Sequence, residues 1–412
     1  TADANLWTAQ QCDADTVISL KNGGGIRAPI GTVGAPTGGT GEAEFLPPAA
    51  NPLSGKAEGE ISQLDIENSL RFNNGLTLLS VTAAELLAII EHGVSATEPG
   101  ATPGQFPQVA GIRFSFDPEA TPGDRVQSLA VVDGDGNRLD VVVEDGELVG
   151  NMDRTFRLVT LSFLADGGDG YPLTEADLSA PNRFDLAAEA CADAGIAAFS
   201  DPGREQDALA EFVNTFFASE PFAEAETAPA DDETIQNLVE REEDTAIPPE
   251  PALAGLRVLH ASPDAPNVDV LVNDVVALGD VPFKAASGFL DVIAGDTNIK
   301  VNAAGTQLTV IEAELPLAEG SNTTVAAINF LESIEPLVLE DDRSAPAEGN
   351  VKVRVVHAAP SFGAVDVYVT PAGAERGAPT LAGVPFTAFS DYLEVPAGTY
   401  TIEVAAAGSE DI

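Results

Sequence analysis

The chain has 412 residues, which is long enough for two or three domains with separate cores. It carries 66 acidic residues against 19 basic ones, a formal net charge of -47. A chain this acidic repels nucleic acid and anionic lipid, so neither is an expected partner. No apolar run is long enough for a membrane span, and such an acidic balance is typical of proteins that work in high salt.

The two cysteines, Cys12 and Cys191, leave two interpretations open. They form one disulfide in an oxidising compartment, or they are two isolated buried thiols. The chain has no Cys-x-x-Cys motif and no Cys/His cluster, so a structural zinc site is not expected. The N-terminus has neither a basic region nor an apolar signal core, so an export signal is absent or already removed.

The first 30 residues predict a helix, a strand and a glycine-rich loop. The apolar run Val17-Ile18-Ser19-Leu20 predicts a buried strand, and Lys21-Asn22-Gly23-Gly24-Gly25-Ile26-Arg27 follows it. Three glycines at a strand end indicate a positive φ or a close approach of another backbone. Their N–H groups can face an anion, and Arg27 adds a planar donor for phosphate or carboxylate.

Residues 31–59 are rich in Gly, Pro, Thr and Ala, which predicts a surface insertion or a long loop. A short helix is expected over 60–70 and a strand over 76–80. Thr82 and Glu85 form a capping-box pattern that predicts a helix from residue 83 to Glu91. His92 then lies at the helix C-terminus, where a cation favours the helix dipole, and is expected to be an ordinary terminal residue.

Alternating apolar residues between 111 and 163 predict hairpin strands at 112–116, 129–131, 139–143 and 156–160. The segment from Asp133 to Asn137 is expected to be a plain hairpin turn. A calcium loop is the less favoured alternative, because no glutamate occupies the closing position. A second glycine-rich loop follows at 161–171, and residues 207–217 predict an amphipathic helix.

The C-terminal part contains an internal repeat after a proline-rich linker at 244–254. Arg257-Val258-Leu259-His260-Ala261-Ser262-Pro263 recurs as Arg354-Val355-Val356-His357-Ala358-Ala359-Pro360. Short alternating strands predict two β-sandwich modules, at 255–341 and 350–412, with a linker at 342–349. The two histidines hold equivalent positions and are expected to be structural. The second module stops before counterparts of the last strands of the first.

Three motifs follow one another in the N-terminal part: Asn22-Gly23-Gly24-Gly25-Ile26-Arg27, Phe72-Asn73-Asn74, and Phe163 followed six residues later by Asp169. In this order they resemble the C-terminal, substrate-binding domain of the 5′-nucleotidase family of metallophosphoesterases. The resemblance implies an α+β domain over residues 1–243. Arg71 stands where the family usually has proline, and the 31–59 loop is longer than the family's. The repeats resemble a β-sandwich module of unknown function from secreted bacterial proteins.

The resemblance implies that the N-terminal domain binds a nucleoside or nucleotide. Phe72 and Phe163 would sandwich the base, since base–aromatic stacking tolerates any base. Asp169 would accept hydrogen bonds from the ribose hydroxyls, and Asn74 would touch the base edge. From spacing alone, two phenylalanines near strand ends are more often core residues, and an aspartate between glycines is more often a turn residue.

On the phosphate side, the resemblance implies contacts from Arg27, Asn22 and the backbone amides of Gly24 and Gly25. The family's other phosphate-side arginines lie upstream of the glycine motif, in a part that this sequence does not include. The family hydrolyses phosphate esters with two divalent metal ions, held in a separate N-terminal domain. No cofactor is therefore expected within this chain, and the chain alone is expected to be inactive. The metal domain is the implied partner, and the location is expected to be extracellular or periplasmic.

A different class of function remains open alongside this one. The tandem β-sandwiches and the incomplete second module are also compatible with an extracellular structural or adhesive protein. Such a protein would reuse a nucleotidase-like domain and form filaments by donating strands between subunits.

Overall fold

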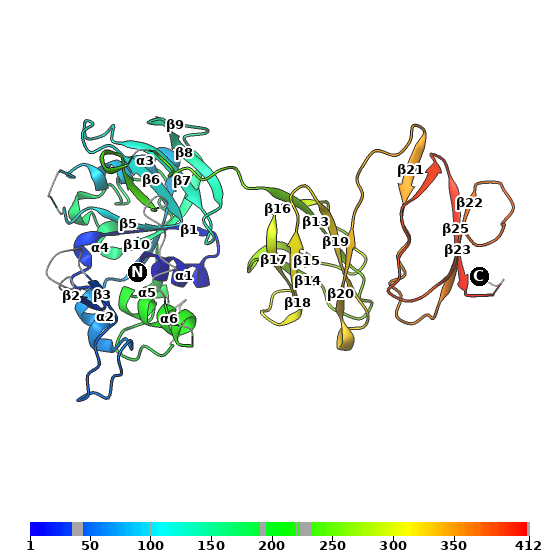
Figure 1. The fold of residues 1–412 in the computed structure, drawn as a ribbon, viewed down its shortest axis with the longest axis horizontal. Helices are drawn as coiled ribbons and strands as arrows, with labels where there is room; N and C mark the ends of the chain where they lie inside the picture. The colour runs from blue at the N-terminus through cyan, green and yellow to red at the C-terminus, as the bar shows by residue number, and fades with distance from the viewer. Residues whose placement is uncertain are drawn as a thin grey trace. The chain divides into compact units, whose positions relative to one another are not determined.

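The computed structural model describes residues 1–34, 44–98, 101, 103–189, 195–219, 221–222, 233–241 and 243–409. The chain divides into two compact units, Thr1–Glu250 and Pro251–Ile412 (Figure 1). The first unit mixes helices and sheets and the second consists of β-strands, as the sequence predicts. None of the helices in the described ranges is long and apolar enough to cross a membrane.

The first sheet of the N-terminal unit carries its strand β1 deep in the core, where most of its side chains are buried. β10 pairs parallel with β1 and antiparallel with β4. The sequence-based assignment of 156–160 to the hairpin sheet is wrong, because Leu158, Val159, Thr160 and Leu161 of β10 are all buried in a central position. The strand order is β11 (Phe184–Asp185), β4 (Leu76–Thr82), β10 (Thr155–Leu161), β1 (Thr16–Asn22) and β5 (Pro107–Ala110).

The second sheet contains the predicted antiparallel hairpins. Asp133 accepts hydrogen bonds from the backbone N–H groups of Asp135 and Asn137 at 3.0 and 2.9 Å, so this segment is the plain turn that the sequence predicts. The strand order is β12 (Ile235–Asn237), β6 (Ile112–Phe116), β7 (Val126–Val132), β8 (Arg138–Glu144) and β9 (Glu147–Leu148). Within the predicted 31–59 loop, β2 (Thr32–Gly34) pairs with β3 (Glu44–Leu46).

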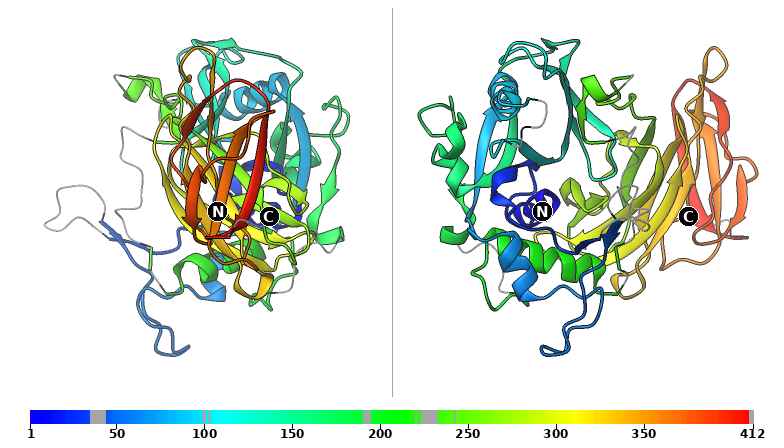
Figure 2. Two further views of the ribbon diagram at one scale, coloured as in Figure 1. Left: turned by 90° about the vertical axis from the view of Figure 1, so that its right-hand side faces the viewer. Right: turned by 60° about the vertical axis from the view of Figure 1, so that its left-hand side comes forward.

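The helices pack around these two sheets. The predicted capping box begins α3: Thr82 Oγ1 accepts from Glu85 N, and Glu85 accepts from Thr82 N. α1 packs on α6 (Figure 2). The ring of Trp7 in α1 meets that of Phe212 in α6 edge-on at 6.1 Å. Cys12, which ends α1, is disulfide-bonded, and Cys191 lies outside the described residues. The helices are α1 (Ala2–Cys12), α2 (Gln63–Ser69), α3 (Ala83–Val94), α4 (Ser162–Ala165), α5 (Leu186–Glu189) and α6 (Glu205–Phe217).

The second unit begins with a sandwich of two four-stranded sheets around an apolar core that includes Leu256, Val270 and Ile299. One sheet has the order β16 (Leu290–Ile293), β13 (Leu253–His260), β19 (Asn322–Ile328) and β20 (Glu335–Glu340). The other has the order β15 (Val275–Val281), β14 (Val268–Val272), β17 (Gly295–Ala303) and β18 (Thr309–Leu317).

The second copy of the repeat reproduces part of this arrangement. β21 (Asn350–Val353) pairs with β24 (Leu393–Pro396), and β22 (Val365–Pro371) lies between β23 (Leu381–Val384) and β25 (Tyr400–Ala406). His260 Nε2 lies 3.0 Å from Pro266 O, and His357 Nε2 lies 2.9 Å from Gly363 O, so both histidines have the predicted structural role. Up to residue 409, the second copy has no counterparts of β18, β19 and β20.

The predicted linker at 244–254 is shorter than expected. Asp244 accepts hydrogen bonds from the hydroxyls of Ser115 and Ser128 at 2.5 and 2.7 Å, and Ala246 is fully buried. At the other end, β13 already begins at Leu253. The prolines that indicate a linker do not reveal that the residues before them pack on a sheet.

Candidate functional site

The topology of the first sheet brings three of the predicted motifs to one edge. Because β1 and β10 run parallel and β4 runs antiparallel, the ends of β1 and β10 lie beside the start of β4. The register pairs Leu20 with Thr160 and Leu161 with Leu76. Asn22 ends β1, Phe163 follows β10, and the segment 72–74 precedes β4, so all three motifs lie at this edge.

Phe72 and Phe163 are exposed at this edge, at 64% and 43% of their surface. The alternative that they are core residues is therefore wrong. The Phe163 ring packs over the backbone of Gly168, where a Cβ would lie 2.5 Å from two of its ring atoms. The ring contacts among the described residues do not include one between Phe72 and Phe163.

Asp169 is held in place by two neighbours. Its Oδ2 accepts a hydrogen bond from Asn22 Nδ2 at 2.6 Å, and its backbone oxygen lies 2.9 Å from His92 Nε2. The His92 ring meets Tyr171 edge-on at 4.8 Å. The backbone of Asp169 has φ 51°, a left-handed conformation that aspartate adopts more readily than most residues. The side chain is exposed at the same edge as the two phenylalanines, so its carboxylate is available to a ligand.

Two amides of the glycine loop have partners within the fold, which removes them from the anion cradle that the sequence suggests. Gly23 N donates to Phe106 O at 2.7 Å, and Gly24 N donates to Gly104 O at 2.8 Å. These two amides are therefore already used within the fold. The glycines are required by close approach, because a Cβ on Gly24 would lie 3.0 Å from the Gly104 Cα. None of Gly23, Gly24 and Gly25 has a positive φ.

Arg27 is exposed beside this loop. Its backbone N–H donates to Ser69 O at 2.8 Å, and its Nη1 donates to Gly24 O at 3.0 Å. A guanidinium has five donors in one plane, so one bond to the loop fixes its direction and leaves other donors for an anion.

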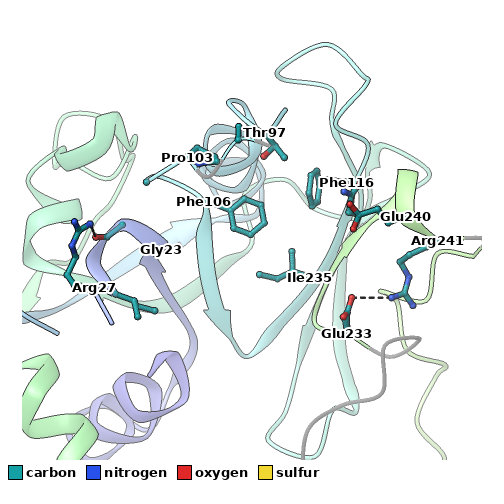
Figure 3. Close-up of a pocket in the computed structure, with 15 residues that line it drawn as sticks. Gly23, Arg27, Thr97, Pro103, Phe106, Phe116, Glu233, Ile235, Glu240 and Arg241 are labelled. Carbon is teal, nitrogen blue, oxygen red and sulfur yellow. Dashed lines mark hydrogen bonds and ion pairs between the residues drawn. The ribbon is translucent and has the colours of Figure 1, made fainter. Parts of the chain in front are cut away.

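A pocket of about 800 Å³ adjoins the glycine loop (Figure 3). Phe106 and Phe116 meet edge-on at 5.9 Å in its wall, and an ion pair of 3.5 Å joins Arg241 to Glu233. Of the predicted site residues, it includes only Gly24 and Arg27. Its lining residues are Gly23, Gly24, Ile26, Arg27, Thr97, Ala101, Pro103, Gly104, Phe106, Phe116, Glu233, Ile235, Asn237, Glu240 and Arg241.

Asn74 is tied to a residue that the sequence did not reveal. Its backbone N and its Nδ2 both donate to Glu205 Oε1, at 3.0 and 2.9 Å. Glu205 begins α6 and is fully buried, as is its ion-pair partner Lys21. A lysine directly after the apolar run 17–20, within a buried strand, is the one sequence signal that could have pointed to this pair. His92, which supports Asp169, was also missed as part of the site.

Asp207, two residues after Glu205, tests how much burial of a charged carboxylate lowers the stability of the folded N-terminal unit. Burial raises the pKa of Asp207 to about 6 from an ordinary 3.8. The folded state therefore holds this proton more tightly, and the stability gained is complete below about pH 4 and lost as pH rises to about 6.

We expect Asp207→Asn to raise the free energy of unfolding at pH 7 and to remove the fall in stability between pH 4 and 6. Gly203 N, which donates to Asp207 Oδ2 at 3.3 Å, keeps an acceptor in this variant. Trp7, the only tryptophan, belongs to the N-terminal unit, so urea titrations followed by its fluorescence report on that unit. The exposed Asp15→Asn is the control. Equal pH profiles for Asp207→Asn and wild type would contradict the raised pKa.

Comparisons with known proteins match the two parts of the chain separately. A family model described as "5'-nucleotidase, C-terminal domain" matches residues 2–176. A second, described as "Domain of unknown function (DUF4397)", matches residues 254–368.

Among curated proteins, the trifunctional nucleotide phosphoesterase protein YfkN of Bacillus subtilis is 31% identical over 176 residues, 42% of this chain and 9% of that protein. The snake venom 5'-nucleotidase of Macrovipera lebetinus is 30% identical over 169 residues, 41% of this chain and 34% of that protein. The 5'-nucleotidase precursor of Thermus thermophilus has a crystal structure that is 24% identical. It covers 57% of this chain and 34% of that one, with a TM-score of 0.36. The chain thus spans a minor part of each of these relatives.

Proposed function

Because residues 2–176 form a 5′-nucleotidase C-terminal domain and a DUF4397 domain follows it, we propose that the N-terminal unit binds a nucleoside or nucleotide. It does so for a phosphoesterase whose two metal ions belong to a separate domain. The matched region does not include that metallophosphoesterase domain. Among the described residues, no group of three or more His, Cys, Asp or Glu is placed to hold a metal ion.

The observation that carries this proposal is the exposure of Phe72 and Phe163 at the ends of two neighbouring strands. Exposing large apolar side chains to water costs free energy, and a ligand that covers them removes that cost. A nucleobase fits that requirement, because stacking on an aromatic ring is worth roughly 1–3 kcal/mol per base.

The polar groups around the phenylalanines suit the rest of a nucleotide. Asp169, fixed by Asn22, accepts hydrogen bonds from the ribose hydroxyls. Arg27, fixed by Gly24 O, donates to the phosphate, whereas the amides of Gly23 and Gly24 are excluded from that role by their backbone partners. Asn74 meets the base edge.

We place the protein outside the cytoplasm, in the extracellular or periplasmic space. The disulfide at Cys12 supports this proposal, since structural disulfides persist in oxidising compartments.

Isothermal titration calorimetry of the whole chain with adenosine and with AMP tests the proposed binding. We expect one saturable site for each ligand and none for ribose alone, because the base supplies most of the buried apolar surface. The titrations should be run at high salt, where the charge of -47 is screened. Absence of heat from both adenosine and AMP at millimolar concentration would contradict the proposal.

A further inference from the structure

A buried ion pair lies against the segment that carries Asn74. Lys21 Nζ and Glu205 Oε2 are 2.7 Å apart, and both side chains have 0% exposure. Glu205 lies outside the residues that match the nucleotidase domain, 2–176. Burying two charges is costly, and an apolar pair of similar volume is often as stable or more so. The pair therefore calls for an explanation other than stability.

The segment already has anchors that do not involve this pair. Arg204 Nη1 donates to Asn73 O at 3.0 Å, and Gln206 Nε2 donates to Leu70 O at 2.8 Å. Glu205 N donates to Asn74 O at 3.0 Å through the backbone alone. The Glu205 carboxylate adds two contacts with Asn74, one with its backbone N and one with its side-chain amide.

The side-chain contact fixes the orientation of the amide. Glu205 Oε1 lies 2.9 Å from Asn74 Nδ2, and an ionised carboxylate can only accept hydrogen bonds. If the amide turned over, its Oδ1 would face that carboxylate, acceptor against acceptor. Lys21 has only donors, so it holds the second carboxylate oxygen as an acceptor too. The ion pair thus allows one of the two amide orientations.

We propose that Glu205 and Lys21 are positioning residues that fix the Asn74 amide and thereby make the site select 6-amino purines over 6-oxo purines. The inference rests on the proposed nucleoside site. With one N–H taken by Glu205, Asn74 presents its acceptor Oδ1 and one remaining donor. On its Watson–Crick edge, adenine offers the amino group at C6 beside the acceptor nitrogen N1, which matches the acceptor and donor of Asn74. Hypoxanthine offers an oxygen at C6 beside a protonated N1, the reverse pattern, so binding it through the same atoms requires the amide to turn over.

The test compares adenosine with inosine in Lys21→Met/Glu205→Leu. This double variant nearly keeps the side-chain volumes and leaves no unpaired charge. A leucine has no donor or acceptor, so the Asn74 amide is no longer held in one orientation. We expect wild type to bind adenosine at least 10-fold more tightly than inosine, and the variant to bring this ratio within about 3-fold of 1. Each tenfold in affinity corresponds to about 1.4 kcal/mol.

A purely structural role predicts another result, because a loosened segment would weaken both nucleosides by one factor and leave their ratio unchanged. That result, or a wild-type ratio near 1, would overturn the inference while nucleoside binding itself still held. No binding of either nucleoside to wild type would instead refute the proposed function.

Asn74→Ala is the second variant. It leaves the ion pair intact, and its ratio of adenosine to inosine affinity should also approach 1. If Asn74→Ala kept the wild-type ratio, the inference would be wrong even if the double variant failed to fold.

Discussion

Phe163→Ala is expected to weaken adenosine binding by roughly 5- to 150-fold, the range that corresponds to 1–3 kcal/mol of stacking. The Phe163 ring is 43% exposed at the end of β10 and packs over Gly168. Its removal takes away one face of the proposed base slot. Phe163→Tyr keeps the ring and should restore most of the affinity. Calorimetric titration with adenosine measures both changes.

Phe163→Ala also removes the contact of the ring with the loop at Gly168. Phe72→Ala tests the other proposed stacking ring. Phe72 is 64% exposed, so its truncation should lower affinity in the same range with little change in stability. The matched control is Phe362→Ala, since Phe362 is 66% exposed and belongs to the C-terminal unit. If wild type and Phe163→Ala bound adenosine with equal affinity, the proposal that the base binds at this edge of the sheet would be wrong.

Local patterns of the sequence predicted the local structure well. The capping box at Thr82 and Glu85 and the turn that begins at Asp133 depend on residues three or four positions apart. The cap and the turn require only the geometry of a few neighbouring residues. That Asn22, Phe72 and Phe163 belong to one site was implied by the family resemblance, and the strand pairing places all three at one edge of the first sheet.

The features that the sequence did not reveal depend on distant partners. Lys21 and Glu205 are 184 positions apart, and His92 reaches the Asp169 backbone across 77 positions. The triple glycine was ambiguous for the same reason. Whether its amides face an anion or another backbone depends on Gly104 and Phe106, which no pattern near residue 23 specifies. The place of β10 in the first sheet also depends on pairing with β1 across the chain.

Lys21→Met is expected to cost about 3–5 kcal/mol of unfolding free energy, because it leaves the carboxylate of Glu205 buried without its cation. A second double variant, Lys21→Met/Glu205→Gln, should recover most of that loss, since it removes both charges and keeps the side-chain volumes. Urea titrations followed by the fluorescence of Trp7 measure both values in the N-terminal unit.

The control carries the same substitution at a partly exposed ion pair of the same unit. Lys56 Nζ lies 2.6 Å from Asp65, whose side chain is 28% exposed. Water can still reach that carboxylate, so Lys56→Met should cost about 1 kcal/mol or less. If Lys21→Met cost no more than Lys56→Met, the Lys21–Glu205 pair would not be the buried charge pair that the geometry describes. The orientation of Asn74 would then have no electrostatic basis.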